Sequence, residues 1–189
     1  MARNDGRRTQ LADAGLRVLA RDGARGLTHR AVDREAATPV GTASNYFASR
    51  AELIEALVAR IGVRLAPSPE VLAYLGAQPP TRELFAAYIR DIVSRLTHER
   101  DVTLALLELR LEAARRPDVA DALGTWQRAA FAADVEFNTA AGLPGGHSEI
   151  ALFHYAIDGL LLDRLTTSID PGTGTDDVVD ALVARLLPI

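Results

Sequence analysis

Apolar side chains recur at three- and four-residue spacing along almost the whole chain, and this periodicity limits the possible folds most strongly. In residues 7–22, for example, one helical face carries only apolar side chains: Leu11, Ala14, Val18 and Leu19. No segment shows the strict alternation of a half-buried strand. The sequence therefore predicts an all-α protein.

Cap and turn residues divide this pattern into separate helices. Thr28 is a candidate N-cap for a helix that runs through Glu35, and Pro39 suits the first position of a third helix ending near Phe47. Ser49 and Glu52 have the spacing of a capping box before a fourth helix. Later helices are expected at about 81–97, 101–115, 118–141, 147–168 and 175–187. We expect a small N-terminal domain of residues 1–48 and a larger helical domain of residues 49–189.

The composition excludes several classes of protein. There is no cysteine, so neither a disulfide nor a thiolate metal site can form, and we expect no metal or cofactor. No apolar run approaches the roughly 18 residues of a membrane span, which predicts a soluble, cytoplasmic protein. Residues 1–65 carry eleven Arg and seven acidic residues, whereas residues 66–189 carry ten Arg and eighteen. A basic head on an acidic body is often found in nucleic-acid-binding proteins.

Three short helices within about 50 residues, with a tight turn between the second and third, match a helix-turn-helix unit. In the segment "TPVGTASNYFASR", Ala43 and Phe47 are spaced to face a core. The remaining side chains are short donors and acceptors, a methyl-bearing group and a phenol, which suit base edges and phosphates. An ordinary polar helix face has the same pattern, so the residues alone leave both interpretations open.

The stretch "GLTHRAVDREAATPVGTASNYFASRAELIEAL" resembles the DNA-binding head of the TetR family of bacterial transcriptional regulators. The residues that carry the resemblance are Thr28, Gly41, Thr42, Tyr46, Phe47, Ser49, Arg50 and Leu53. The resemblance implies a homodimer that binds double-stranded operator DNA and responds to a small-molecule effector.

By position, the resemblance assigns the DNA contacts to two groups of residues. Base contacts would come from Arg30, Val40, Gly41, Thr42 and Asn45. Phosphate contacts would come from Thr28, His29, Ser44, Tyr46 and Arg50.

Three residues depart from the family pattern. Ala37 stands where the family turn usually has Gly, so the turn either avoids a positive φ or is strained. Asp33 replaces a small apolar residue, and we expect its carboxylate to reach solvent or an Arg. Ser44 stands where the family commonly has Tyr, which removes any contact from that ring.

The body is expected to hold an effector pocket and a dimer interface, both implied by the resemblance. The candidate pocket residues are Tyr88, Leu107, Arg110, Trp126, Phe131 and His154. Residues 147–168 are apolar nearly all round, which predicts burial on more than one side. The last helix has two apolar stripes, one expected to face the core and the other a partner chain. The candidate interface residues are Phe153, Ile157, Leu161, Leu182 and Leu186.

The expected function is a ligand-responsive transcriptional regulator, a repressor that binds a palindromic operator and is released by a small molecule. The alternative is an all-α carrier or enzyme that does not bind DNA. A carboxylate-bridged metal bundle needs Glu-x-x-His on two helices, and no Glu here has His three residues later. HExxH, G-x-S-x-G and P-loop motifs are also absent from the sequence, so we expect no enzymatic activity.

Overall fold

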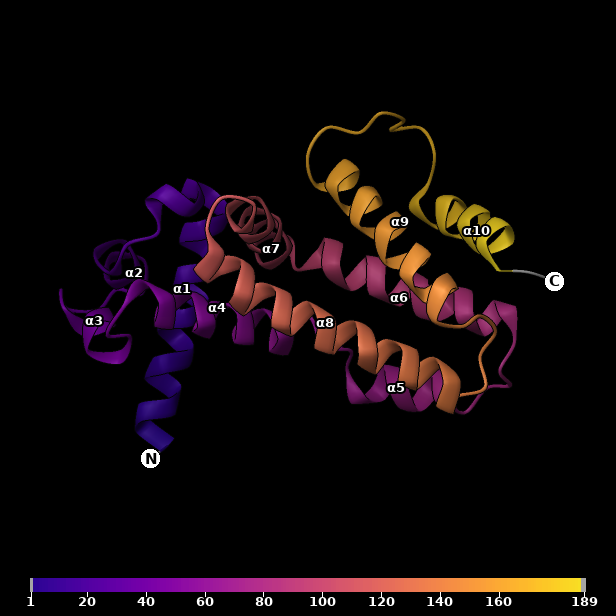
Figure 1. Cartoon of the computed structure of the whole chain (residues 1–189), viewed down its shortest axis with the longest axis horizontal. Coiled ribbons are helices and arrows are strands. Elements are labelled where there is room, and N and C mark those ends of the chain that lie inside the picture. Colours follow the sequence, from indigo (N-terminus) through magenta and orange to yellow (C-terminus); the bar gives the residue numbers. More distant parts are fainter. Residues whose placement is uncertain (1, 188–189) are drawn as a thin grey trace. The chain divides into compact units, whose positions relative to one another are not determined.

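The computed structural model describes residues 2–187, with side chains from residue 5 onward. All regular elements within these residues are α-helices, which confirms the predicted fold class (Figure 1). Their bounds are α1 Ala2–Gly26, α2 His29–Glu35, α3 Thr42–Tyr46, α4 Arg50–Arg64, α5 Pro69–Gly76, α6 Arg82–His98, α7 Arg100–Ala113, α8 Pro117–Ala140, α9 His147–Leu165 and α10 Thr175–Leu186.

The described residues pack as two compact units. The head unit comprises the chain up to Ala66 together with Glu99–Gln127, and the body unit comprises Pro67–His98 together with the chain from Arg128 onward. The head unit thus contains α1 to α4, α7 and the first part of α8. The expected domain boundary after residue 48 lies inside the head unit, and it stays a prediction.

At the centre of the head unit, α1 packs against α2, α4 and α7. Its predicted apolar face is confirmed, because its members are at most 1% exposed: Leu11, Ala14, Val18 and Leu19. A Cβ on Gly15 would lie 2.7 Å from Leu57 Cδ2, so the missing side chain allows α4 to approach α1 closely. At Gly23, α1 has a kink with a φ of 68°, in the left-handed region that favours glycine.

A half-buried ion-pair cluster joins α1, α4 and the start of α7. Arg60 Nε donates to Asp13 Oδ1 at 2.8 Å, and Arg64 Nη1 donates to the same oxygen at 3.1 Å. Arg64 also pairs with Glu99. Burial would raise the pKa of Asp13, but the hydrogen bonds and charges of the two arginines outweigh it and lower that pKa. Asp13 therefore stays ionised at neutral pH and ties the C-terminal end of α4 to α1.

The start of α4 shows a shifted form of the predicted capping box. Ser49 Oγ accepts a hydrogen bond from Glu52 N at 3.1 Å, which confirms Ser49 as the cap. The carboxylate of Glu52 accepts from Ala48 N at 2.9 Å, one residue before the cap. The side chain of Glu52 therefore also fixes the chain that leaves α3.

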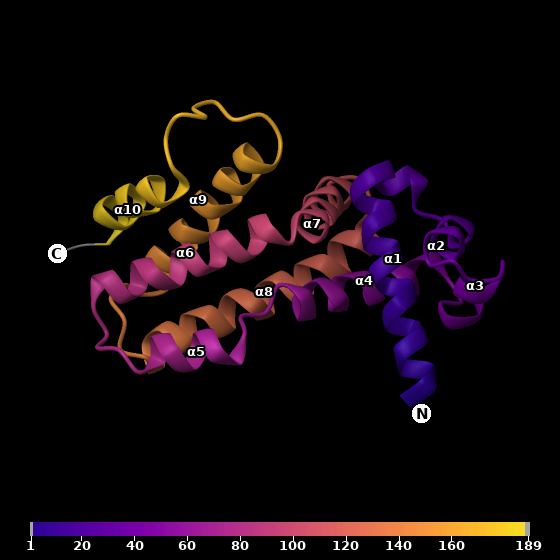
Figure 2. The ribbon, with the colours of Figure 1, turned by 180° about the vertical axis from the view of Figure 1, so that it is seen from behind.

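Three helices of the body unit, α6, α9 and α10, pack on one another, as the views in Figures 1 and 2 agree. The rings of Phe85 on α6 and Phe153 on α9 lie 4.8 Å apart between centroids. Val179, Val183 and Leu187 are at most 5% exposed, which confirms that one stripe of α10 faces the core.

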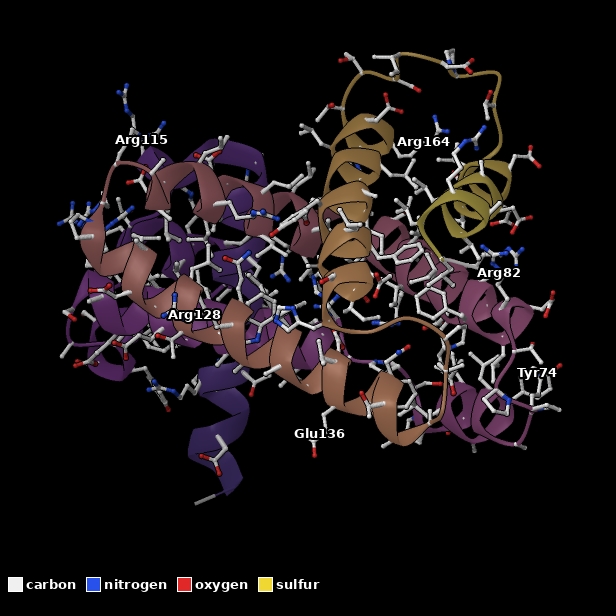
Figure 3. The ribbon with its side chains drawn as sticks, turned by 45° about the vertical axis from the view of Figure 1, so that its right-hand side comes forward. Tyr74, Arg82, Arg115, Arg128, Glu136 and Arg164 are labelled. Carbon is white, nitrogen blue, oxygen red and sulfur yellow. The ribbon has the colours of Figure 1, made fainter. Side chains whose placement is uncertain are left out.

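Two arginines hold the C-terminal part of the body unit (Figure 3). Arg82 on α6 donates to carbonyl oxygens at the end of α10, including that of Val183 at 3.1 Å. Arg164 on α9 donates to the carbonyl oxygens of Asp170 at 3.3 Å and Thr173 at 2.9 Å. Because both guanidinium groups bind backbone oxygens, they stabilise the helix end and the loop between α9 and α10.

The short helix α5 was not predicted. Ser68 Oγ accepts from Val71 N at 3.2 Å, and Pro69 is the first residue of the helix. This is the Ser-Pro start signal of a helix, present in the segment "APSPE" that the sequence pattern presents as a break.

No described helix is both long and apolar enough to cross a membrane.

The predicted interface residues of α9 lie in the core of their own chain. Phe153, Ile157 and Leu161, expected at the dimer interface, are only 1%, 8% and 3% exposed because they lie in the core of their own chain. These three side chains leave almost no free surface in their own chain, and their assignment to the interface stays a prediction. Leu182 and Leu186 of α10 are half-buried beside the same core.

A second apolar stripe on α9 is exposed instead. Leu152, Tyr155 and Leu162 are 44%, 71% and 51% exposed, at spacings that place them on one helical face. Gly159 lies on the same face, and a Cβ added there would have no neighbour within 4 Å. Within the described residues this second stripe is not covered, so the prediction that α9 is buried on more than one side stays a prediction.

Candidate nucleic-acid interface

Helices α2 and α3 and the turn of residues 36–41 between them form the predicted helix-turn-helix (Figure 1). Thr28 Oγ1 accepts from Ala31 N at 3.1 Å, which confirms the predicted cap of α2. The expected start of α3 at Pro39 is wrong, because the helix begins at Thr42 with Gly41 as its N-cap. Pro39 lies in the turn, where its carbonyl oxygen accepts from Thr42 N at 3.1 Å.

The turn leaves α2 through a left-handed residue. Ala37 N donates to Arg34 O at 3.2 Å and Thr38 N donates to Asp33 O at 2.9 Å, the bond pattern of a Schellman motif. Ala37 occupies its left-handed position with a φ of 52°. The turn therefore keeps the conformation that usually requires glycine, and it is strained.

Asp33 is buried beneath this turn, with 1% of its surface exposed. Its Oδ2 accepts from Gly41 N at 2.8 Å and its Oδ1 accepts from Ala43 N at 2.6 Å. Thr38 Oγ1 lies 3.4 Å from Oδ1. The prediction that this carboxylate reaches solvent or an Arg is wrong, because backbone N–H groups at the start of α3 satisfy it.

Residues from α1 and α2 hold the other end of α3. Arg8 Nη1 donates to Tyr46 O at 2.9 Å, and its guanidinium carbon lies 4.7 Å from the centre of the Phe47 ring. The Nε2 atom of His29 lies 2.9 Å from Phe47 O, at hydrogen-bonding distance. A five-residue helix is too short to be stable alone. Side chains from other helices therefore fix its position at both ends.

The segment of residues 40–46 places most of the predicted DNA contacts together. Val40 is 79% exposed in the turn, and Ser44 and Asn45 are exposed on α3. Gly41, Thr42 and Tyr46 are partly exposed. Thr28 and Arg30 are exposed at the start of α2. This surface offers a branched apolar group, two hydroxyls, an amide and a phenol.

The backbone conformation at position 41, and not a close neighbour, requires glycine. Its φ is 95°, a left-handed value that side chains rarely adopt, while an added Cβ would have no neighbour within 4 Å in this chain. The conformation of the N-cap is therefore a sufficient reason for glycine at this position.

Arg50 has a structural role that the sequence did not reveal. Its Nη2 donates to Ala24 O at 2.8 Å and its Nη1 donates to Leu27 O, near the C-terminal end of α1. Cations are stabilising at such helix ends. Each of these two nitrogens carries a second N–H group that could still donate to a phosphate. The predicted phosphate contact of Arg50 therefore stays a prediction.

Glu35 joins α2 to α1 through two exposed arginines. Its carboxylate oxygens lie 2.8 Å from Arg17 Nε and 2.8 Å from Arg21 Nη1. Hydrogen bonds from Arg17 and then Arg21 lower the pKa of Glu35. The pairs are solvent-exposed, so they orient α2 more than they stabilise it.

The six predicted effector-pocket residues divide between the units. Leu107, Arg110 and Trp126 belong to the head unit, where a Cβ on Gly62 would lie 2.8 Å from the Trp126 indole nitrogen. Gly62, which lies on α4, therefore makes room for the indole of Trp126.

The other three predicted pocket residues, Tyr88, Phe131 and His154, belong to the body unit. The Phe131 ring packs edge-on against His154, with centroids 5.3 Å apart, and Tyr88 packs edge-on against Phe137 at 5.2 Å. His154 is half-exposed and lies 3.0 Å from Asp134 Oδ2, so it is not a core histidine. The pocket assignment stays a prediction.

Comparisons with known proteins agree with this arrangement. The family described as "Bacterial regulatory proteins, tetR family" matches residues 11–57, and "Tetracyclin repressor-like, C-terminal domain" matches residues 80–189. No curated protein matches the chain.

Solved structures share the fold over nearly the full length. The multidrug binding protein EbrR, crystallised with ethidium, is 26% identical with a TM-score of 0.69, and the match covers 97% of this chain and 99% of EbrR. A TetR-family member from Streptomyces coelicolor A3 is 26% identical with a TM-score of 0.70, over 97% and 99% of the two chains. A putative TetR-family regulator from Rhodococcus sp. is 20% identical with a TM-score of 0.72, over 94% and 95%.

The domain matches extend over both the helix-turn-helix and most of the remaining chain. Proteins of this kind are ligand-responsive DNA-binding regulators and not enzymes. The chain belongs to the TetR family of bacterial transcriptional regulators.

Proposed function

We propose that this protein is a dimeric repressor that binds a palindromic operator in the cytoplasm and leaves it when a small molecule binds the body. The observation that carries the proposal is the exposed surface of residues 40–46 on a recognition helix fixed at both ends. Two such helices, related by a twofold axis, would read an inverted repeat.

In this proposal, the deepest base contacts come from Val40, Thr42 and Asn45. The exposed Val40 side chain suits a thymine methyl group. Asn45 is exposed on α3 and can bind adenine through two hydrogen bonds. Arg30 at the start of α2 would reach a further base. Thymine and adenine contacts of this kind would give each half-site an A·T-containing core.

The phosphate contacts would flank this core. The candidates are Thr28, His29, Ser44, Tyr46 and Arg50, as the resemblance implies. Three of them already lie against carbonyl oxygens of the chain: His29 at Phe47, Arg50 at Ala24 and Ser44, whose hydroxyl donates to Gly41 O at 2.9 Å. We therefore give the larger roles to the hydroxyl of Tyr46 and to the exposed Thr28, whose oxygen accepts from Ala31 N while its own hydrogen can still donate to a phosphate.

The dimer interface in this proposal is the exposed stripe of α9 formed by Leu152, Tyr155, Gly159 and Leu162. These side chains contribute apolar surface that no part of their own unit covers. Gly159 leaves open space at the centre of the stripe, which allows close approach of a second helix. The half-buried Leu182 and Leu186 on α10 would extend the interface.

We propose a planar aromatic cation as the effector. EbrR, at 26% identity, was crystallised with ethidium, a molecule of this class. The body unit has partly exposed aromatic rings: Phe131 and Phe137 on α8, and Tyr88 on α6, which packs against Phe137. Two exposed carboxylates, Asp134 and Glu136, also lie on α8. Figure 3 shows Glu136 pointing outward from α8. Aromatic faces and carboxylates together attract a flat cation.

Release from DNA would be a shift in population. The effector would bind more tightly to the arrangement of the dimer in which the two recognition helices no longer match the operator spacing. The effector can lower the DNA affinity at most by a factor equal to the ratio of its own affinities for the two arrangements.

Selection from a pool of random DNA tests the proposal directly. The expected result is an enriched inverted repeat, and ethidium should raise the melting temperature of the protein in the absence of DNA, because ethidium intercalates into DNA and would itself change an affinity measured on a duplex. A neutral aromatic compound of similar size is the control for the effector class. Absence of any enriched sequence would contradict the proposed function and favour a carrier that does not bind DNA.

A further inference from the structure

Asp33 occupies a position that explains how a five-residue recognition helix keeps its place. The N-cap of α3 is Gly41, which has no side chain to accept a hydrogen bond from the first turn. The N–H groups at a helix start need an acceptor. Asp33 reaches them from α2, eight and ten residues earlier in the chain.

The carboxylate binds the N-cap residue itself and the first turn of α3. One oxygen accepts from Gly41 N at 2.8 Å and the other from Ala43 N at 2.6 Å. The main-chain oxygen of Asp33 also accepts from Thr38 N at 2.9 Å, within the turn. A single buried residue thus fixes the exit from α2, the left-handed N-cap and the first turn of α3.

These contacts leave little freedom at the surface that faces DNA. Thr42 lies between the two residues whose amides Asp33 holds, and Asn45 is one helical turn farther on. Because base-edge hydrogen bonds weaken steeply with distance and angle, a small rotation of α3 would remove them. Phosphate contacts through long or flexible groups tolerate such a rotation better.

We propose that Asp33 is a positioning residue for sequence recognition: its carboxylate sets the rotation of α3 and thereby the register of Thr42 and Asn45 on the base pairs. The inference rests on the proposed DNA-binding function. It assigns Asp33 no contact with DNA, since the carboxylate is buried. The same carboxylate also occupies the amides at the start of α3, so a phosphate does not bind there.

The test compares Asp33→Asn and Asp33→Ala with wild type. The Asn variant keeps the shape and one acceptor oxygen, whereas Ala leaves both N–H groups without a partner. The charge-matched control is Glu55→Gln, at an exposed position of α4. Affinity is measured for the operator selected by the wild type and for a scrambled duplex, at a temperature where circular dichroism shows each variant to be folded.

We expect operator affinity to fall about 10- to 100-fold in Asp33→Ala, the range of one or two unsatisfied buried groups, and less in Asp33→Asn. Affinity for the scrambled duplex should stay within about twofold, because phosphate contacts supply most of it. Glu55→Gln should retain the wild-type ratio of the two affinities. Equal losses on both duplexes, or an unchanged ratio in the Ala variant, would overturn the inference.

Hydrogen exchange provides a second measurement that does not need DNA. The amides of Gly41 and Ala43 should exchange faster in Asp33→Asn than in wild type, while the amides of α4 remain unchanged. Unchanged exchange at both amides would also overturn the inference, even if the Ala variant does not fold. If the wild type selects no DNA sequence, the proposed function itself fails; if it selects one and the variants select it equally well, only the role of Asp33 fails.

Discussion

Replacing Ala37 with Gly should stabilise the protein. Ala37 has a φ of 52° in the turn after α2, and its side chain is exposed, so the substitution removes no buried contact. For a residue with a side chain, the left-handed conformation raises the free energy of the folded state by about 1–2 kcal/mol. Glycine avoids this strain but gives the unfolded chain more freedom, which costs about 0.4–1 kcal/mol.

The difference predicts a net gain of about 0.5–1 kcal/mol in the free energy of unfolding. For a chain of this length, this corresponds to a rise of about 1–4 °C in melting temperature. The control is Ala59→Gly, at an exposed position inside α4 with ordinary helical geometry. It should lose about 1 kcal/mol, as glycine does in helix interiors.

Chemical denaturation of both variants at one fixed protein concentration checks the prediction, because the stability of the proposed dimer would depend on concentration. The two substitutions are chemically identical and should act in opposite directions. If Ala37→Gly destabilises the protein as Ala59→Gly does, the turn does not hold the strain that its geometry indicates.

Three further substitutions test the proposed surfaces. Asn45→Ala should relax sequence preference at one position of each half-site, at a cost of about 1–3 kcal/mol per lost bidentate contact; parallel selections on wild type and variant that return identical motifs would refute this. Arg50→Gln removes two hydrogen bonds, to Ala24 O in α1 and to Leu27 O just after it, and should lower the free energy of unfolding by about 2 kcal/mol. If Arg50 also contacts a phosphate, the slope of log affinity against log salt should flatten by about one unit, and an unchanged slope would leave only the structural role. Leu162→Arg should produce monomers in sedimentation, whereas a dimer of unchanged affinity would place the interface elsewhere.

Much of the fold could be predicted because it depends on local signals. The apolar spacing in residues 7–22 indicated the buried face of α1, and Thr28 and Ser49 marked two helix starts through their own backbone neighbours. Such caps act over three residues, so a single sequence is sufficient to find them. The surface of residues 40–46 followed from the same local pattern together with the family resemblance.

The sequence did not reveal the contacts in which a residue binds a partner far along the chain. Arg8 reaches Tyr46 across 38 positions, and Arg50 reaches Ala24 across 26. Both look like free surface cations in the sequence, as Asp33 looks like a solvated acid. Charge alone does not indicate whether a side chain turns to solvent, to DNA or to a backbone group.

The apolar stripes of α9 show the same division. Periodicity showed that this helix has apolar side chains on several faces, but it could not tell which face its own chain covers. Only the packing of α6 and α10 buries Phe153 and Ile157 and leaves Leu152 and Tyr155 exposed. Hydrophobic burial has no direction of its own, so the sequence determined which residues avoid water, and the tertiary structure decided which of them are covered by their own chain.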